Sequence, residues 1–239
     1  DWALPHRFVS GLGVVGYASP SNLFPEDPVK ASRSAAQLLG PEADAWNLKV
    51  AKDPTQPNEA DQILWDKTLK AKKAGKLKGP YSKAQLDKLF GKGQWRAIRR
   101  RLVWSASHGK YREIDNARTS LHNSAADASE TILTAATDTS VAFLLFLRQL
   151  LGQPLTGLLQ PSLACDDLKD AYHGMPNKAS QLRFTIVATK DPQSGQVKFF
   201  VAYVHLFGFN LAVSNFYRFP AMMTALCRRL GAVMVWHVF

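Results

Sequence analysis

The residues most able to do chemistry lie together at positions 165–172, which read CDDLKDAY. A carboxylate such as Asp167 can hold the divalent metal ions that clamp an in-line phosphoryl displacement. Three residues later comes Asp170, then the small Ala171, which lets backbone N–H groups approach a triphosphate. The ring of Tyr172 can stack beneath a sugar and exclude a 2′-hydroxyl. The alternative is a polar surface turn, which the spacing alone does not exclude.

Positive charge is concentrated in one segment. The net charge is +11, and residues 49–118 hold 18 Lys and Arg against 7 Asp and Glu, which accounts for the whole surplus. A local basic surplus favours a polyanionic partner, because neutralising phosphates releases condensed counterions. Arg99, Arg100 and Arg101 are therefore candidate nucleic-acid-binding residues, whereas the lysines of 67–78 also fit a solvated helix face.

The elements that must position these residues are both helices and strands, so the fold class is α+β. Seven prolines leave residues 1–60 irregular, with room only for short helices. Helices are predicted at 29–39, 42–51, 61–74, after the capping box Ser82/Gln85, at 139–151 as a buried helix, and at 211–230 with a kink or break at Pro220. Strands are predicted as two hairpins, 99–104 with 111–115 and 182–189 with 197–207, and at 233–239.

Residues 167–172 (DLKDAY) resemble the first palm motif of reverse transcriptases, which is Asp-Leu-Lys-x-Ala followed by Tyr or Phe. The resemblance implies that Asp167 is the catalytic, metal-binding aspartate and that Asp170 and Ala171 line the triphosphate site. It also implies that Tyr172 is the steric gate. Residues 173–176 (HGMP) depart from the family, which usually has Gln before the hydrophobic-Pro pair.

Two further stretches resemble the same family in order and spacing. Residues 206–218 (LFGFNLAVSNFYR) resemble the loop and helix of the second palm motif, where Gly208 would let a nascent base pair come close. Residues 95–123 resemble the fingers hairpin and its continuation. This resemblance implies that Lys110 and Arg112 lie over the nucleotide's phosphates, and the planar guanidinium group of arginine suits phosphate oxygens. The pattern is most similar to retroelement polymerases of the tyrosine-recombinase or related divergent kinds, across residues 61–239.

The resemblance implies a right-hand polymerase fold with three parts: an irregular extension at 1–60, fingers at 61–160 and a partial palm at 161–239. It implies an RNA-directed DNA polymerase that adds dNTPs to a primer by two-metal catalysis with Mg²⁺ or Mn²⁺. Its partners would be an RNA or DNA template–primer and dNTPs. In the family, a strand carrying two adjacent aspartates follows the second palm motif, and here those residues would come after Phe239. We therefore expect the 239-residue chain to bind no metal tightly and to lack primer extension; extension that Asp167→Ala abolishes would contradict this.

Two alternatives remain at this stage. The chain could be a decayed or repurposed copy that binds nucleic acid without catalysis, or an unrelated basic RNA-binding domain. No secretory signal opens the sequence, no apolar run reaches the length of about 20 residues of a membrane span, and there are two cysteines. These features predict an intracellular protein, in cytoplasm or nucleus, without membrane contact.

Overall fold

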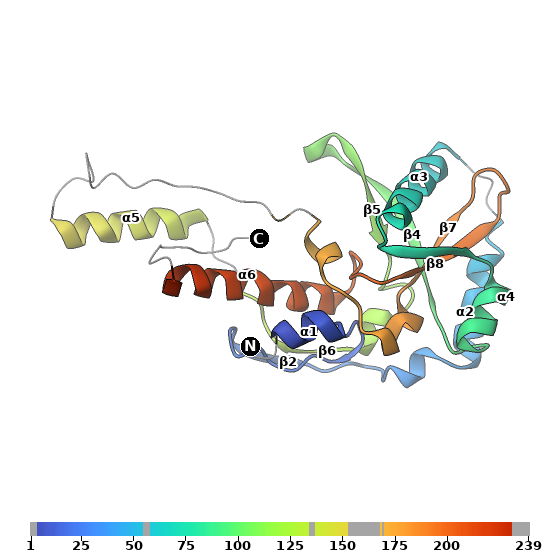
Figure 1. Cartoon of the computed structure of the whole chain (residues 1–239), viewed down its shortest axis with the longest axis horizontal. Coiled ribbons are helices and arrows are strands. Elements are labelled where there is room, and N and C mark those ends of the chain that lie inside the picture. The colour runs from blue at the N-terminus through green and yellow to red at the C-terminus, as the bar shows by residue number, and fades with distance from the viewer. Residues whose placement is uncertain (1–3, 55–57, 134–136, 153–167, 169, 231–239) are drawn as a thin grey trace.

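The computed structural model describes residues 4–54, 58–133, 137–152, 168 and 170–230, which form a mixed α+β fold, as the sequence predicts (Figure 1). Asp167 and the strand predicted at 233–239 lie outside these residues. The helices are α1 (Leu4–Ser10), α2 (Pro41–Ala51), α3 (Glu59–Lys73), α4 (Lys83–Phe90), α5 (Thr137–Leu151) and α6 (Asn210–Leu230). The strands are β1 (Gly16–Tyr17), β2 (Glu26–Val29), β3 (Leu77–Tyr81), β4 (Ala97–Ser105), β5 (Lys110–Asp115), β6 (Ala126–Glu130), β7 (Ile186–Lys190) and β8 (Val197–Ala202). Short 3₁₀ helices occupy Ala36–Leu38, Ala106–His108, His122–Ala125, Ala171–Gly174 and Ala179–Phe184.

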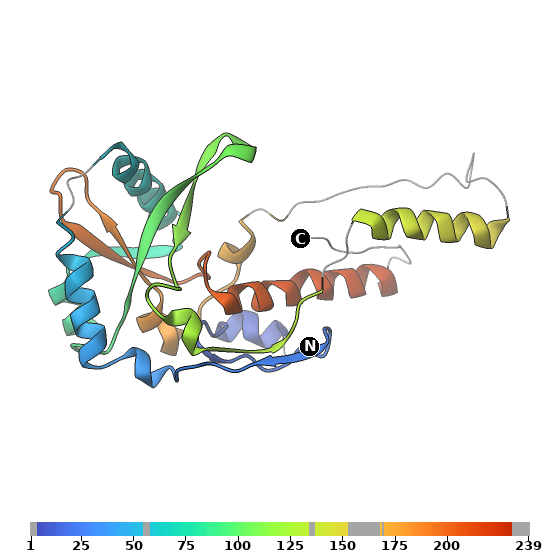
Figure 2. The ribbon, with the colours of Figure 1, turned by 180° about the vertical axis from the view of Figure 1, so that it is seen from behind.

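A five-stranded sheet in the order β3-β8-β7-β4-β5 organises the chain. β4 and β7 run parallel, and the other neighbours are antiparallel. Both predicted hairpins are confirmed, as β4–β5 and β7–β8. The second is shorter than predicted, because a 3₁₀ helix precedes β7 and because β8 ends at Ala202. Figures 1 and 2 show α6 extending away from this sheet, with α5 farther out still.

Both faces of the sheet are buried. Alternate residues of a strand point to opposite faces, so each strand contributes to two core clusters. One cluster gathers Ala97, Ile186 and Phe199 with residues of α2 and α4. The other gathers their neighbours Ile98, Val187 and Phe200 with residues of α3, α6 and the N-terminal segment. Helices on both sides of β4 and β7 therefore hold these strands rigidly.

The first 40 residues differ from the prediction. The helix predicted at 29–39 is wrong: β2 ends at Val29, and one 3₁₀ turn follows at Ala36–Leu38. β1 and β2 pair on either side of β6, forming a second sheet with residues about 100 positions away. Such distant pairing leaves no periodic signal in the local sequence. The helix predicted at 42–51 is confirmed as α2.

The other predicted helices form. α4 begins at the predicted capping box, in which Ser82 and Gln85 each accept a backbone N–H of the other. α6 runs from Asn210 to Leu230 without a break at Pro220. The helix predicted at 139–151 also forms, as α5, but it is not buried: Leu145 is 60% exposed and Leu150 is 67% exposed. Length and apolar content predicted this helix correctly, but its burial depended on a packing partner that the described residues do not provide.

His205 is a buried, neutral histidine in the core. Its Nδ1 lies 2.6 Å from Oδ1 of Asn177, whose amide nitrogen already donates to two backbone carbonyls, so Nδ1–H is the donor. Its Nε2 accepts from Nδ2 of Asn215 at 2.8 Å. Burial lowers the pKa of His205 from 6.5 to about 4.

We expect acid to destabilise the fold through this group. Below pH 6.5 the side chain of His205 is protonated in the unfolded chain but stays neutral in the folded one. The free energy of unfolding therefore falls by about 1–2 kcal/mol between pH 6.5 and pH 5. His122, whose pKa burial lowers to about 3, acts in the same direction. Urea unfolding at both pH values should show a smaller pH dependence in His205→Gln than in the unaltered chain. An equal pH dependence in both proteins would contradict the assignment.

Candidate nucleotide-binding site

The loop before α6 lies directly against the end of the β4–β5 hairpin. Gly208 has φ +110°, and a Cβ at this position would lie 2.0 Å from the carbonyl oxygen of Asp115. The side chain of Asn123 joins the same two segments: its Nδ2 donates to the carbonyl of Gly208 at 2.8 Å, and its Oδ1 accepts from the backbone N–H of Asn210 at 3.0 Å. A glycine is needed here, but the group that approaches it is the chain's own backbone. Its predicted approach to nucleic acid stays a prediction.

A buried ion pair holds the base of the hairpin. Arg100 donates from Nε and Nη2 to the two carboxylate oxygens of Asp115, at 2.8 and 3.0 Å. Both side chains are almost fully buried. Burial works against the charge on Arg100, but the attraction of Asp115 outweighs it, and the pKa of Arg100 is raised. Arg100 therefore stabilises the base of the hairpin, and its predicted contact with nucleic acid stays a prediction.

The segment after Asp167 packs against the Gly208 loop. Tyr172 is 7% exposed, and its ring makes edge contacts with Phe207 and Phe216, at centroid distances of 5.0 and 5.3 Å. Asp170 and Ala171 have positive φ, which sharply turns the chain, and Asp170 pairs with Lys76 at 2.9 Å. The structure thus places Tyr172 in the core, and its role as a steric gate stays a prediction.

His173 shows how close the segment comes to the hairpin base. Its ring lies 5.2 Å from that of Phe207. Its pKa is lowered, first by burial and then by the positive charges of Lys76 and Arg100. Three segments that are distant in sequence, 170–174, 206–210 and 113–123, therefore meet at one place.

The remaining basic candidates lie on the other face of the hairpin. The register pairs Arg101 with Ile114, Val103 with Arg112 and Ser105 with Lys110, and directly paired residues share a face. Asp115 lies on the opposite face, since strand residues alternate. Arg101, Lys110 and Arg112 form no ion pair with any other described residue, and they make a row toward the hairpin tip, which we call the hairpin basic row. The structure does not bring Lys110 and Arg112 against Tyr172.

Neither a protein-family model nor a curated protein sequence matches this chain.

The described residues hold only part of the predicted metal site. Asp167 is outside it, and Asp170 is engaged with Lys76. Among the described residues no group of three or more His, Cys, Asp or Glu side chains is placed to hold a metal. None of the helices in those residues combines the length and apolar content that a membrane span requires.

Sequence reasoning missed several residues that build this region. Lys76 pairs with Asp170, and Asp53, Thr189 and Lys190 line a cavity beside Arg99. Each is a single polar residue outside any motif, so its role follows only from what the fold brings next to it.

Proposed function

We propose that this chain forms the fingers and part of the palm of a retroelement RNA-directed DNA polymerase. The observation that carries the proposal is the meeting of the three motif segments around Gly208, Asp115 and Tyr172. Each was selected from the sequence for resembling one conserved element of reverse transcriptases. Unrelated surface turns would have no reason to converge.

In this proposal the residues keep the roles that the resemblance implies. Asp167 would hold the metal ion, which would supply charge neutralisation for phosphoryl transfer when bound. Asp170 and Ala171 lie beside the triphosphate, Tyr172 limits the space at the sugar, and Gly208 leaves room for the base pair. Lys110 and Arg112 approach the phosphates when the hairpin closes over the nucleotide. The buried Arg100–Asp115 pair keeps the hairpin base rigid during this movement.

A second candidate, a nucleic-acid-binding protein without catalysis, is favoured by the hairpin basic row alone. Three cations without ion pairs in the described residues can follow a phosphate backbone. Both candidates predict binding, but only the polymerase predicts recognition of the nucleotide that the template specifies.

The decisive measurement is therefore the stability of a template–primer complex in the presence of Mg²⁺ and each dNTP in turn. We expect the complementary dNTP to slow dissociation of the complex and the three others to leave it unchanged. Arg112→Gln should remove this effect, whereas Lys73→Gln, at an exposed end of α3, should keep it. Equal dissociation with all four dNTPs would reject the polymerase and leave the binding protein.

Template–primer binding itself should depend on the hairpin basic row. We expect the triple variant Arg101→Gln/Lys110→Gln/Arg112→Gln to bind at least about tenfold more weakly at moderate salt. The slope of log affinity against log salt should fall by about 3, one unit for each phosphate contact. The matched control replaces the exposed α3 residues Lys70, Lys72 and Lys73 by Gln, which removes the same charge. Equal losses in the two triple variants, measured by fluorescence anisotropy, would show that only net charge matters.

A further inference from the structure

The central sheet opens where β4 and β7 part. Their parallel pairing runs from Ala97↔Ile186 to Arg99↔Ala188 and then stops. Beyond this point β4 pairs with β5 on one side, and β7 turns into β8 on the other. Connections that leave two adjacent parallel strands in opposite directions create a crevice at the carboxyl ends of the strands, which is a common place for ligands.

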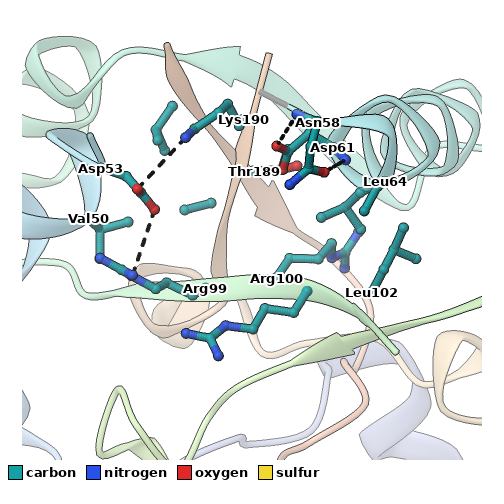
Figure 3. Close-up of a pocket in the computed structure, with 14 residues that line it drawn as sticks. Val50, Asp53, Asn58, Asp61, Leu64, Arg99, Arg100, Leu102, Thr189 and Lys190 are labelled. Carbon is teal, nitrogen blue, oxygen red and sulfur yellow. Dashed lines mark hydrogen bonds and ion pairs between the residues drawn. The ribbon is translucent and has the colours of Figure 1, made fainter. Parts of the chain in front are cut away.

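A cavity of about 270 Å³ occupies this crevice. Its lining comes from both faces of the sheet: Arg99, Ala188 and Lys190 belong to one face, and Leu102 and Thr189 to the other. The end of α2 and the first turns of α3 complete the lining (Figure 3). Apolar walls come from Val50, Leu64, Leu102, Ala188 and Val197.

Thr189 carries a buried hydroxyl that lacks a hydrogen bond. The residue is 3% exposed, and its Oγ1 has no partner among the described residues; the same holds for Nε of Arg99. A buried polar group left unpaired costs about 1–3 kcal/mol. Because Thr189 and Arg99 belong to opposite faces of the sheet, two different oxygens of a ligand in the gap between β4 and β7 would be needed to satisfy these donors.

The charge of the cavity is positive. Arg99 and Lys190 flank the carboxylate of Asp53, each at 3.7 Å, as Figure 3 shows. Lys190 is 5% exposed, so its ammonium group is held inside the cavity rather than in water.

Two further charged side chains of the lining already have partners within the protein. Asp61 accepts the backbone N–H of Asn58 in the capping box of α3, and Arg100 is neutralised by Asp115. Arg101 adds another cation to the lining. Apart from the neutralised Arg100, the lining therefore has three cations, Arg99, Arg101 and Lys190. Its carboxylates are those of Asp53 and Asp61, so the net charge is positive and favours an anionic ligand.

We propose that this cavity binds a small phosphate monoester. Arg99 and Lys190 bind the phosphate oxygens, for which the planar guanidinium fork is suited. The hydroxyl of Thr189 donates to a third oxygen, and the apolar walls enclose the organic part of the ester. The ester is either a free nucleotide or the 5′-phosphate of a nucleic-acid strand. This site goes beyond the proposed polymerase function and shares no residue with the segments that meet at Gly208.

The test measures binding by calorimetry to the purified chain with inorganic phosphate, a nucleoside 5′-monophosphate and the neutral nucleoside. We expect both phosphates to bind and the neutral nucleoside to bind at least about tenfold more weakly. Thr189→Val keeps the shape of the side chain and removes only the hydroxyl, so it should weaken binding of the monophosphate about five- to tenfold. Its melting temperature should be unchanged or higher, because an unsatisfied polar group has been removed. Lys73→Gln removes one positive charge outside the cavity, and this control should bind the monophosphate as tightly as the unaltered chain does.

Three outcomes would overturn the proposal: no binding of either phosphate, equal affinity for the neutral nucleoside, or full affinity in Thr189→Val. Loss of monophosphate binding in Arg112→Gln instead of Thr189→Val would place the ligand at the polymerase site and not in the cavity. A tetranucleotide with a 5′-phosphate distinguishes the two sources. If it competes more strongly than the monophosphate, the ligand is a strand end; if it competes less, the ligand is a free nucleotide.

Discussion

Gly208→Ala is expected to lower the free energy of unfolding by at least about 3 kcal/mol. Two costs add at this position. A residue with a side chain is strained at φ +110°, and its Cβ would overlap the carbonyl oxygen of Asp115 at 2.0 Å. Because that oxygen belongs to the backbone, a side-chain rotation cannot relieve the overlap, and the loop must separate from the hairpin. Urea unfolding of the two proteins measures the difference.

The matched control is Gly109→Ala in the turn of the β4–β5 hairpin. Gly109 also has positive φ, at +56°, but a Cβ there would meet no atom within 4 Å. We expect this variant to lose only about 1 kcal/mol, the cost of the left-handed backbone. The excess loss in Gly208→Ala measures the contact between the loop and the hairpin base. Equal losses in the two variants would mean that this contact does not exist in solution.

Arg100→Met is expected to lower the free energy of unfolding by about 3–5 kcal/mol, because it leaves the carboxylate of Asp115 buried without a counter-charge. The side chain of Asp115 is only 2% exposed, so water cannot replace the lost partner. Adding Asp115→Leu to this variant should recover much of the loss, since two apolar groups then fill the space. The double variant separates the cost of an unpaired charge from the cost of altered packing.

The same hairpin offers a more exposed ion pair for comparison. Lys67 and Glu113 lie 2.9 Å apart, with side chains 37% and 24% exposed. Lys67→Met should therefore cost no more than about 1 kcal/mol. If Lys67→Met and Arg100→Met destabilise the protein equally, burial is not what makes the Arg100–Asp115 pair matter.

The local sequence predicted those elements whose signals are local. The capping box at Ser82 and Gln85 begins α4, and the apolar periodicity of 211–230 continues through Pro220 as α6. The β4–β5 hairpin follows from two strand-like runs around a polar turn that contains Gly109. Where the signal was not local, prediction failed: β2 depends on pairing with β6, and the exposure of α5 depends on which elements pack nearby.

The candidate site divides in the same way. Residue types, charge and the resemblance to reverse transcriptases together selected Asp170, Tyr172, Gly208 and the arginines of β4. They could not distinguish Arg100 from Arg99 and Arg101, because alternation along a strand tells which residues share a face but not which face is buried. Arg100 lies on the buried face because it pairs with Asp115 and because other elements pack on that face of the sheet.

From the sequence alone came the mixed α+β class, most of the helices and both hairpins, because capping, periodicity and turn chemistry act over a few residues. The proposed resemblance of three motifs to reverse transcriptases likewise came from the sequence. Only the tertiary structure decided that these motifs meet and that Gly208 faces the backbone of Asp115. It alone showed that β4 and β7 part to leave a positively charged cavity around Thr189. These are relations between residues distant in the sequence, such as Asp115 and Gly208 or Asp53 and Lys190, and they follow from the packing of the whole chain rather than from any local preference.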